Sequence, residues 1–189
     1  MGGAKGRGLA GVDVLRGVTA AFILLFLQVQ ASSIAVARPD AAAETVIIGR
    51  VVAIADGDTL TVLTEARQQV RGRLAGIDTP ERAQPYGSRA RQELSELAFG
   101  KQARVAVHDT DRYGRTVGRV HAEGRDVNAE MVRRGVAWVY RRYSSDATLL
   151  ALEAEARESR RGLWALPEAE RVPPWEWRAA RRGEKRPAQ

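Results

Sequence analysis

β-branched and alternating runs recur along the chain after residue 44 and predict five strands. The runs 45–48 and 51–54 are rich in Val and Ile, and we interpret them as one strand that bends at Gly49. The four further strands are predicted at residues 59–63, 70–77, 104–108 and 116–121, the second of these four being interrupted by Gly72 and Gly76. Turn dipeptides, Asp-Gly at 56–57 and Glu-Gly at 123–124, separate some of these runs.

Helical periodicity appears in three places. After Ser88, apolar residues fall on one helical face, and Gly100 follows as a stop signal. A second, short helix is expected to be capped by Asp126 and to end by Gly135, and a third to start after Asp146 and end at Gly162. The apolar positions that support the first and third helices are Ala90, Leu94, Leu97 and Ala98, and Leu149, Leu152 and Ala156.

The first 37 residues have the order of a secretory signal peptide. Lys5, Arg7 and Arg16 precede a 12-residue apolar core at 18–29, and Ala-Val-Ala at 35–37 offers a cleavage site. An uncleaved membrane anchor is the alternative, because a helix needs about 20 residues to span a bilayer and the charge-free run 17–37 is just long enough. Its second half contains two Gln and two Ser residues, which favours cleavage. Either reading predicts export, to the periplasm, the cell surface or the medium.

The chain therefore divides into four predicted parts. They are a signal peptide at 1–37, a linker at 38–44, a folded domain at 45–164 and a tail at 165–189. The tail is rich in Pro, Trp and Arg and shows no clear periodicity, so we expect its end to be disordered.

The composition of the chain limits the partners and the kinds of site that it can have. Hydrophobic residues make up 44% of the chain, which is ordinary for a globular protein. The net charge is +7, and +5 remains without residues 1–37, which hold three of the 30 basic and one of the 23 acidic residues. Such a balance suits nucleic acid or an anionic membrane surface, although a solvated Arg-rich surface explains it equally well. Cysteine is absent, which excludes disulfides, thiol nucleophiles and cysteine metal sites.

Three short segments combine carboxylates with arginines. They are Asp-Gly-Asp-Thr at 56–59, Arg73 with Asp-Thr-Pro-Glu at 78–81, and Asp-Arg-Tyr-Gly-Arg at 111–115. Each alone is typical of a hairpin turn, a helix cap or a loop between strands. The two histidines, His108 and His121, both lie on predicted strands, and we assign them core or surface roles.

Together the three segments contain the parts that phosphodiester hydrolysis requires. A closed or strongly curved sheet would bring Asp58 beside Asp78 and form a hard oxygen site suited to Ca²⁺ or Mg²⁺. Without His or Cys partners this pair argues against zinc. Arg73 and Arg115 offer planar cationic forks for phosphate, and Glu81 is available as a general base.

In this order and nearly this spacing, the segments resemble the thermonuclease family, whose type member is staphylococcal nuclease. The resemblance runs from about residue 45 to 164 and includes Gly-Leu-Trp at 162–164. It implies an OB-fold, a five-stranded β-barrel with three α-helices. It also implies Ca²⁺-dependent cleavage of DNA and RNA with little sequence preference, leaving 3′-phosphate ends.

The resemblance also assigns roles to single residues. Asp58 and Asp78 match the calcium carboxylates, and Thr79 matches the ligand that acts through its backbone carbonyl. Arg73 and Arg115 match the arginines that stabilise the phosphorane, and Glu81 matches the proposed general base. Asp56 matches an acidic position near the metal. Arg112 and Tyr113 match the positions beside the terminal phosphate, where Arg112 replaces a lysine. Tyr140 or Tyr143 matches the tyrosine that stacks on the base, although either could be a core residue.

Two departures from the family pattern are visible. Only residues 82–85 separate Glu81 from Tyr86, where the type enzyme has a long mobile loop. The segment 173–177, with Trp175 and Trp177, has no counterpart there, and we expect both rings to pack on the barrel rather than bind a base.

Two other classes of protein remain as alternatives. One is an OB-fold protein that binds nucleic acid without cutting it, and the other is a membrane-tethered interaction protein whose basic tail is the working part. The complete set of Asp58, Arg73, Asp78, Glu81 and Arg115 favours a nuclease acting on DNA and RNA. No obligate protein partner is implied, and we expect a monomer.

Overall fold

The strands and helices follow the predicted order, with additional short elements. The computed structural model describes residues 44–184, so the predicted signal peptide lies outside the described residues. Its elements are β1 (Val46–Ile54), β2 (Thr59–Thr64), β3 (Gln69–Leu74), β4 (Ile77–Asp78), α1 (Gly87–Ala98), β5 (Gln102–Thr110), β6 (Thr116–Ala122), β7 (Arg125–Asp126), α2 (Val127–Arg133), β8 (Trp138–Val139), α3 (Ala147–Glu158), the 3₁₀ turns η1 (Gly162–Ala165) and η2 (Glu168–Glu170), and α4 (Pro174–Glu184). No helix within this range is both long enough and apolar enough to cross a membrane.

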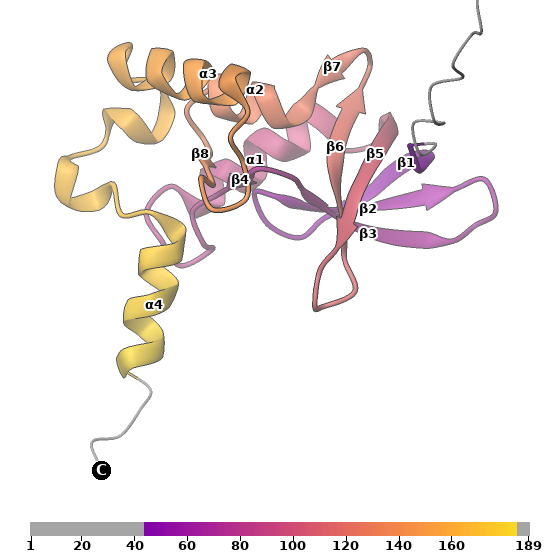
Figure 1. Ribbon diagram of the computed structural model, residues 1–189, viewed down its shortest axis with the longest axis horizontal. Coiled ribbons are helices and arrows are strands. Elements are labelled where there is room, and N and C mark those ends of the chain that lie inside the picture. The colour runs from indigo at the N-terminus through magenta and orange to yellow at the C-terminus, as the bar shows by residue number, and fades with distance from the viewer. Residues whose placement is uncertain (1–43, 185–189) are drawn as a thin grey trace, which may run out of the picture. The chain divides into compact units, whose positions relative to one another are not determined.

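Five strands close into a barrel (Figure 1). The order is β3-β2-β1-β5-β6 with antiparallel neighbours, and a parallel pairing of β3 with β6 closes the ring. β1 pairs with β5 through Arg50 and with β2 from Gly49 onward, so the chain passes from one side of the barrel to the other at the predicted bend. The prediction of a five-stranded OB-type barrel is confirmed.

The predicted third strand is two strands, not one. β3 ends at Leu74, and Gly76 adopts a left-handed φ of +74°, which turns the chain away from the barrel. The next two residues form β4, which pairs with β8 in a separate sheet. This turn carries Asp78 out of the barrel wall.

Aspartates cap the second and third helices as predicted. The carboxylate of Asp126 accepts from the backbone N–H of Ala129, and that of Asp146 accepts from Thr148 and Leu149. Arg119 on β6 forms ion pairs with both capping aspartates. The caps therefore tie the starts of α2 and α3 to the barrel.

We expect Asp146→Ala to lower the free energy of unfolding by about 1 kcal/mol at pH 7, the usual contribution of an N-cap. The hydrogen bond from Arg119 is the main cause that lowers the pKa of Asp146 below its ordinary value of 3.8, against the opposing effect of burial. A lowered folded-state pKa gives stability that is present above pH 4 and is lost as the pH falls through the folded value. Urea unfolding at pH 7 and pH 3 should therefore show a difference between wild type and variant that shrinks in acid. An equal difference at both pH values would contradict this assignment.

The core has two apolar clusters. The larger one fills the barrel and the space under α1, α2 and α3. The smaller one joins Trp138, Ala156, Leu163 and Trp164, and Trp175 packs against it. His108 is exposed on β5 and His121 is partly buried on β6.

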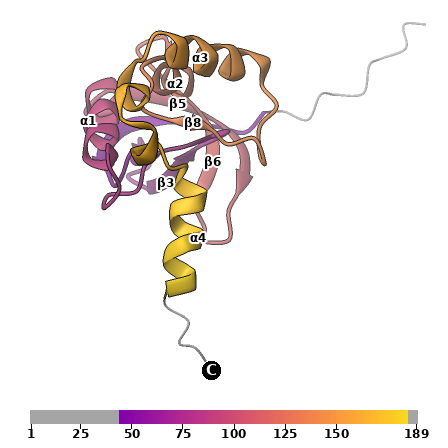
Figure 2. The same cartoon turned by 90° about the vertical axis from the view of Figure 1, so that its left-hand side faces the viewer.

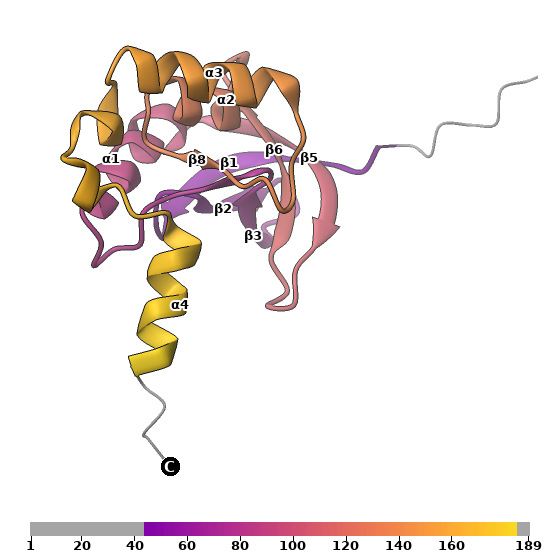
Figure 3. The same cartoon turned by 60° about the vertical axis from the view of Figure 1, so that its left-hand side comes forward.

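The tail contains a helix that its sequence pattern does not predict. α4 begins at Pro174, below β8, and runs away from α2 and α3 (Figures 2 and 3). The barrel domain thus has the three expected helices, and α4 is a fourth. Trp175 packs on the folded domain as expected, whereas the ring of Trp177 makes a cation–π contact with Arg181 of its own helix.

Candidate active site

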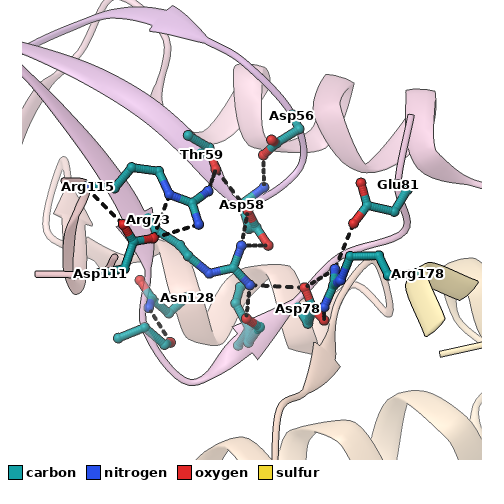
Figure 4. A network of polar contacts seen from close by, with 12 residues as sticks. Asp56, Asp58, Thr59, Arg73, Asp78, Glu81, Asp111, Arg115, Asn128 and Arg178 are labelled. Atoms are coloured by element: carbon teal, nitrogen blue, oxygen red, sulfur yellow. Dashed lines mark hydrogen bonds and ion pairs between the residues drawn. The ribbon is translucent and has the colours of Figure 1, made fainter. Parts of the chain in front are cut away.

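Two buried carboxylates share one arginine. Asp58 directly precedes β2 and Asp78 ends β4, and their exposed fractions are 3% and 0%. Arg73 on β3 donates from Nη1 to Asp58 Oδ1 and from Nη2 to Asp78 Oδ1, each over 3.0 Å (Figure 4). The closed barrel and the turn at Gly76 therefore bring together carboxylates that are far apart in sequence.

The turn before β2 packs tightly on Thr79, the third candidate metal ligand. Asp56 Oδ1 accepts the backbone N–H of Asp58 over 3.1 Å, which shapes the turn. A Cβ atom on Gly57 would lie 2.6 Å from Thr79 Oγ1 and 2.8 Å from Ala90 Cβ. Only glycine allows the backbone beside Asp58 to approach Thr79 this closely.

We expect Gly57→Ala to destabilise the protein by about 1–3 kcal/mol, because the added methyl group overpacks a buried contact. The variant should also bind divalent cations more weakly, since the turn that carries Asp58 must move away from Thr79. Gly72→Ala is the matched control, because its Cβ would meet Leu60 Cδ1 at an ordinary 3.5 Å. Thermal melts with and without Ca²⁺ measure both effects. Equal behaviour of the two variants would show that the close approach at Gly57 is unimportant.

Burial and nearby charges both act on the pKa of Asp58. Burial raises the pKa of Asp58 to about 7, although the positive charge of Arg73 opposes this rise. The negative charges of Asp56 and Asp78 raise the pKa further. Burial and the neighbouring carboxylates therefore favour the neutral form of the Asp58 carboxyl, and Arg73 offsets this only in part.

The residues present fit a hard cation such as calcium. In the described part of the chain, no group of three or more His, Cys, Asp or Glu side chains is placed to hold a metal ion. Calcium also takes backbone carbonyls and waters, so two carboxylates with the carbonyl of Thr79 are a sufficient protein contribution. All of these donors are oxygens, and a bound cation would favour the ionised form of the Asp58 carboxyl.

Arg115 reaches the same site through Thr59. Its Nη1 donates to Thr59 Oγ1 over 3.2 Å, and that hydroxyl donates to Asp58 Oδ1 over 3.0 Å. Asp111 holds the Arg115 side chain by an ion pair of 2.7 Å and also accepts from the backbone N–H groups of Arg115 and Tyr113. The two arginines predicted to bind phosphate therefore both lie close to Asp58 (Figure 4).

The substrate-binding candidates are the more exposed ones. Arg112 and Tyr113 lie in the turn between β5 and β6, and Arg112 Nη2 donates to the Tyr113 hydroxyl. Tyr113 is 69% exposed and Tyr143 is 67% exposed. Tyr140 is partly buried and its ring is stacked on Trp175, with centroids 5.1 Å apart and planes 2° from parallel. The predicted roles of these four residues stay predictions.

Glu81 is already paired. Its Oε1 accepts from Nη1 of Arg178 in α4 over 2.7 Å, and the same guanidinium contacts both oxygens of Asp78. Burial alone would lower the pKa of Arg178, but hydrogen bonds to Asp78 and Glu81 raise it above its ordinary value. Figure 4 shows Arg178 between these two carboxylates.

Sequence reasoning missed two residues of this site. Asp111 was noted only as part of a motif, although an aspartate at the start of a tight turn commonly accepts from backbone N–H groups two to four residues on. Arg178 gave no signal, because its partners lie 97 and 100 residues earlier in the chain.

Comparison with known proteins adds an independent observation. A family model described as staphylococcal nuclease homologue matches residues 71–166. A protein named uncharacterized endonuclease from Escherichia coli O157:H7 is 47% identical, covering 70% of this chain and 85% of its own. A micrococcal nuclease from Shigella flexneri is 44% identical, and the match covers 79% of this chain and 95% of that protein. A staphylococcal-like nuclease, CAN1, from Arabidopsis thaliana is 45% identical over 61% of this chain and 35% of its own.

Proposed function

The chain belongs to the staphylococcal nuclease family and is a nuclease, and from this premise we propose that it is an exported, Ca²⁺-dependent enzyme. In this proposal it hydrolyses phosphodiester bonds of both DNA and RNA with little sequence preference and leaves 3′-phosphate ends. The observation that carries the proposal is the arrangement around Asp58 and Asp78. Both carboxylates are buried, and both are held by an arginine suited to binding phosphate.

Asp58, Asp78 and the carbonyl of Thr79 would hold the calcium ion. When bound, calcium polarises the phosphate and neutralises the negative charge that develops on it during the reaction. Asp56 does not ligate in this assignment but shapes the turn that presents Asp58. Zinc is disfavoured because neither His108 nor His121 contributes to this set.

Arg73 and Arg115 would bind the scissile phosphate. Each presents a permanently charged planar fork that can bond two non-bridging oxygens at once. Their side chains are only 18% and 16% exposed, so their charges act in a poorly solvated environment where such interactions are strong. They are therefore best placed to stabilise the crowded, negatively charged transition state.

Glu81 would accept the proton of the attacking water. It lies three residues after Asp78 and is 41% exposed at its side chain, so solvent can reach it. A carboxylate can act as a general base only when it is free to contact the water. Arg112 and Tyr113 would bind the terminal phosphate, and Tyr143 or Tyr140 would stack on the base.

The alternative of a nucleic-acid-binding protein without activity is disfavoured. All five residues of the predicted catalytic and carboxylate set are present, and the similar proteins from Escherichia coli and Shigella flexneri are named as nucleases. Export is supported by the sequence order of residues 1–37 alone. Amino-terminal sequencing of the secreted protein should begin at residue 38, and an intact amino terminus in the membrane fraction would indicate the anchor instead.

Analysis of the cleavage products tests the reaction class. We expect limited digests of plasmid DNA and of single-stranded RNA to give fragments whose 3′ ends carry phosphate. Such fragments should accept a 5′ label from polynucleotide kinase lacking phosphatase activity, but should not be extended by a polymerase until a phosphatase has treated them. Fragments that a polymerase extends directly would contradict the proposed chemistry.

A further inference from the structure

Helix α4 places a positive charge where the metal would bind. Arg178 Nη2 lies 2.6 Å from Asp78 Oδ2, and Nη1 lies 3.2 Å from Asp78 Oδ1 and 2.7 Å from Glu81 Oε1. Arg73 also donates to Asp78 Oδ1, so both oxygens of this carboxylate have guanidinium donors. A cation bound to Asp78 would therefore meet the positive charge of Arg178, which lies within hydrogen-bond distance of both oxygens.

A second contact of α4 covers another part of the candidate site. The ring of Trp175 is stacked on Tyr140 and meets Trp138 edge-on, with centroids 5.9 Å apart. The segment leading into α4 is held by Gln84, whose Nε2 donates to the carbonyl of Val172. The same helix therefore covers a candidate metal ligand, the candidate base and one candidate base-stacking ring.

These contacts come from a part of the chain beyond the family match, which ends at residue 166. They are ionic and aromatic, the two kinds of interaction that a metal and a nucleobase would themselves make at this surface. Arg178 is 32% exposed and Glu81 is 41% exposed, so water reaches the Arg178–Glu81 pair, whereas Asp78 is buried. The Arg178–Glu81 pair is partly exposed and contributes little stability, and Asp78 keeps Arg73 as a partner when Arg178 leaves, so the contact can open without leaving a buried carboxylate unpaired.

We propose that α4 is an intramolecular competitor of calcium and of the substrate. In the metal-free protein Arg178 occupies Asp78 and Glu81 while Trp175 occupies Tyr140, and α4 must release these residues before calcium and nucleic acid bind. The inference rests on the proposed function, because competition requires that calcium bind at Asp78. Since coupling between two binding events is reciprocal, calcium must loosen α4 by the same factor by which α4 weakens calcium binding.

Calcium titration calorimetry of the purified protein and three variants tests the competition. Arg178→Ala removes the ionic contact, and Trp175→Ala removes the aromatic contact without changing the charge. We expect both variants to bind calcium about two- to fivefold more tightly than wild type, because a partly exposed contact of up to about 1 kcal/mol no longer has to be broken. Arg181→Ala is the charge-matched control. Arg181 is exposed on α4, and within the described residues its only aromatic or ionic contact is with Trp177. This variant should change the dissociation constant of calcium less than twofold.

A spin label on α4 measures the same coupling from the other side. The chain contains no cysteine, so Gly183→Cys gives a single labelling site, and a Cβ there has no neighbour within 4 Å. Calcium should increase the mobility of the label in the otherwise wild-type protein, and the Arg178→Ala background should show high mobility before calcium is added.

The outcomes separate this inference from the proposed function. If all four proteins bind calcium with the same affinity and the label does not respond, α4 does not compete and the proposed function stands. Weaker binding by Arg178→Ala would likewise overturn the inference and make Arg178 a contributor to the metal site. If none of the proteins binds calcium, both the inference and the calcium dependence fail.

Discussion

Replacing Arg73 by alanine is expected to lower the cleavage rate by about 10²–10³-fold, because a charged donor to the transition state is lost in a poorly solvated site. The structure adds a second expected effect. Arg73 is the guanidinium shared by Asp58 and Asp78, so its removal leaves the buried Asp58 without an ion-pair partner, while Asp78 keeps Arg178. We expect the metal-free variant to lose about 3 kcal/mol of stability, as when one partner of a buried ion pair is removed.

Calcium separates the two effects of Arg73→Ala. A cation bound by the carboxylates replaces the lost positive charge, so calcium should raise the melting temperature of the variant more than that of wild type, without restoring its activity. Arg71→Ala on the same strand is the control, because Arg71 is exposed, and its activity should stay within about threefold of wild type. Activity of Arg73→Ala within tenfold of wild type would exclude the proposed role.

The second large effect is expected for Arg115→Ala, again about 10²–10³-fold in cleavage rate. Here stability should change less than in Arg73→Ala, because Asp111 keeps its hydrogen bonds from the backbone N–H groups of Tyr113 and residue 115 and is 19% exposed, so its charge is not left buried without a donor. Asp111→Asn should have a smaller effect of about tenfold, since Asp111 only orients the guanidinium. Single-turnover kinetics with saturating substrate measure both rates.

Arg104→Ala is the control for Arg115. It lies on β5, is exposed and pairs only with the exposed Glu44 among the described residues, so its loss removes one positive charge without touching the site. A similar decrease in both variants would mean that Arg115 contributes only long-range attraction to the substrate. A normal rate in Arg115→Ala would remove it from the catalytic set.

The barrel was predictable because its signals are local. Asp126 and Asp146 cap helices in the structure as their positions before apolar periodic runs predict. The β-branched runs likewise predict the strands themselves, although β1 pairs with β5 and β3 with β6 across long stretches of sequence. The exception is β4, since Gly76 was interpreted as an interruption within one strand and the pattern does not reveal that the next two residues pair with β8.

The docked tail could not be predicted because its contacts are distant and mostly polar. α4 buries Pro174 and part of Trp175, while most of its outer half is exposed, so it lacks the apolar stripe that marks a packed helix. Arg178 is one of many arginines in the sequence, and only the folded chain places it against Asp78 and Glu81. The central carboxylate pair was predicted because three motifs in the right order specify it, whereas the role of Asp111 depends on the geometry of its turn.

The metal requirement of cleavage tests the central claim most directly. Purified protein should be incubated with plasmid DNA and with single-stranded RNA in the presence of calcium, magnesium or EGTA, at one ionic strength. We predict that calcium supports cleavage of both substrates, that EGTA abolishes it, and that added calcium restores it. Equal cleavage in calcium and EGTA would show that Asp58 and Asp78 do not act by holding a metal ion and would contradict this account.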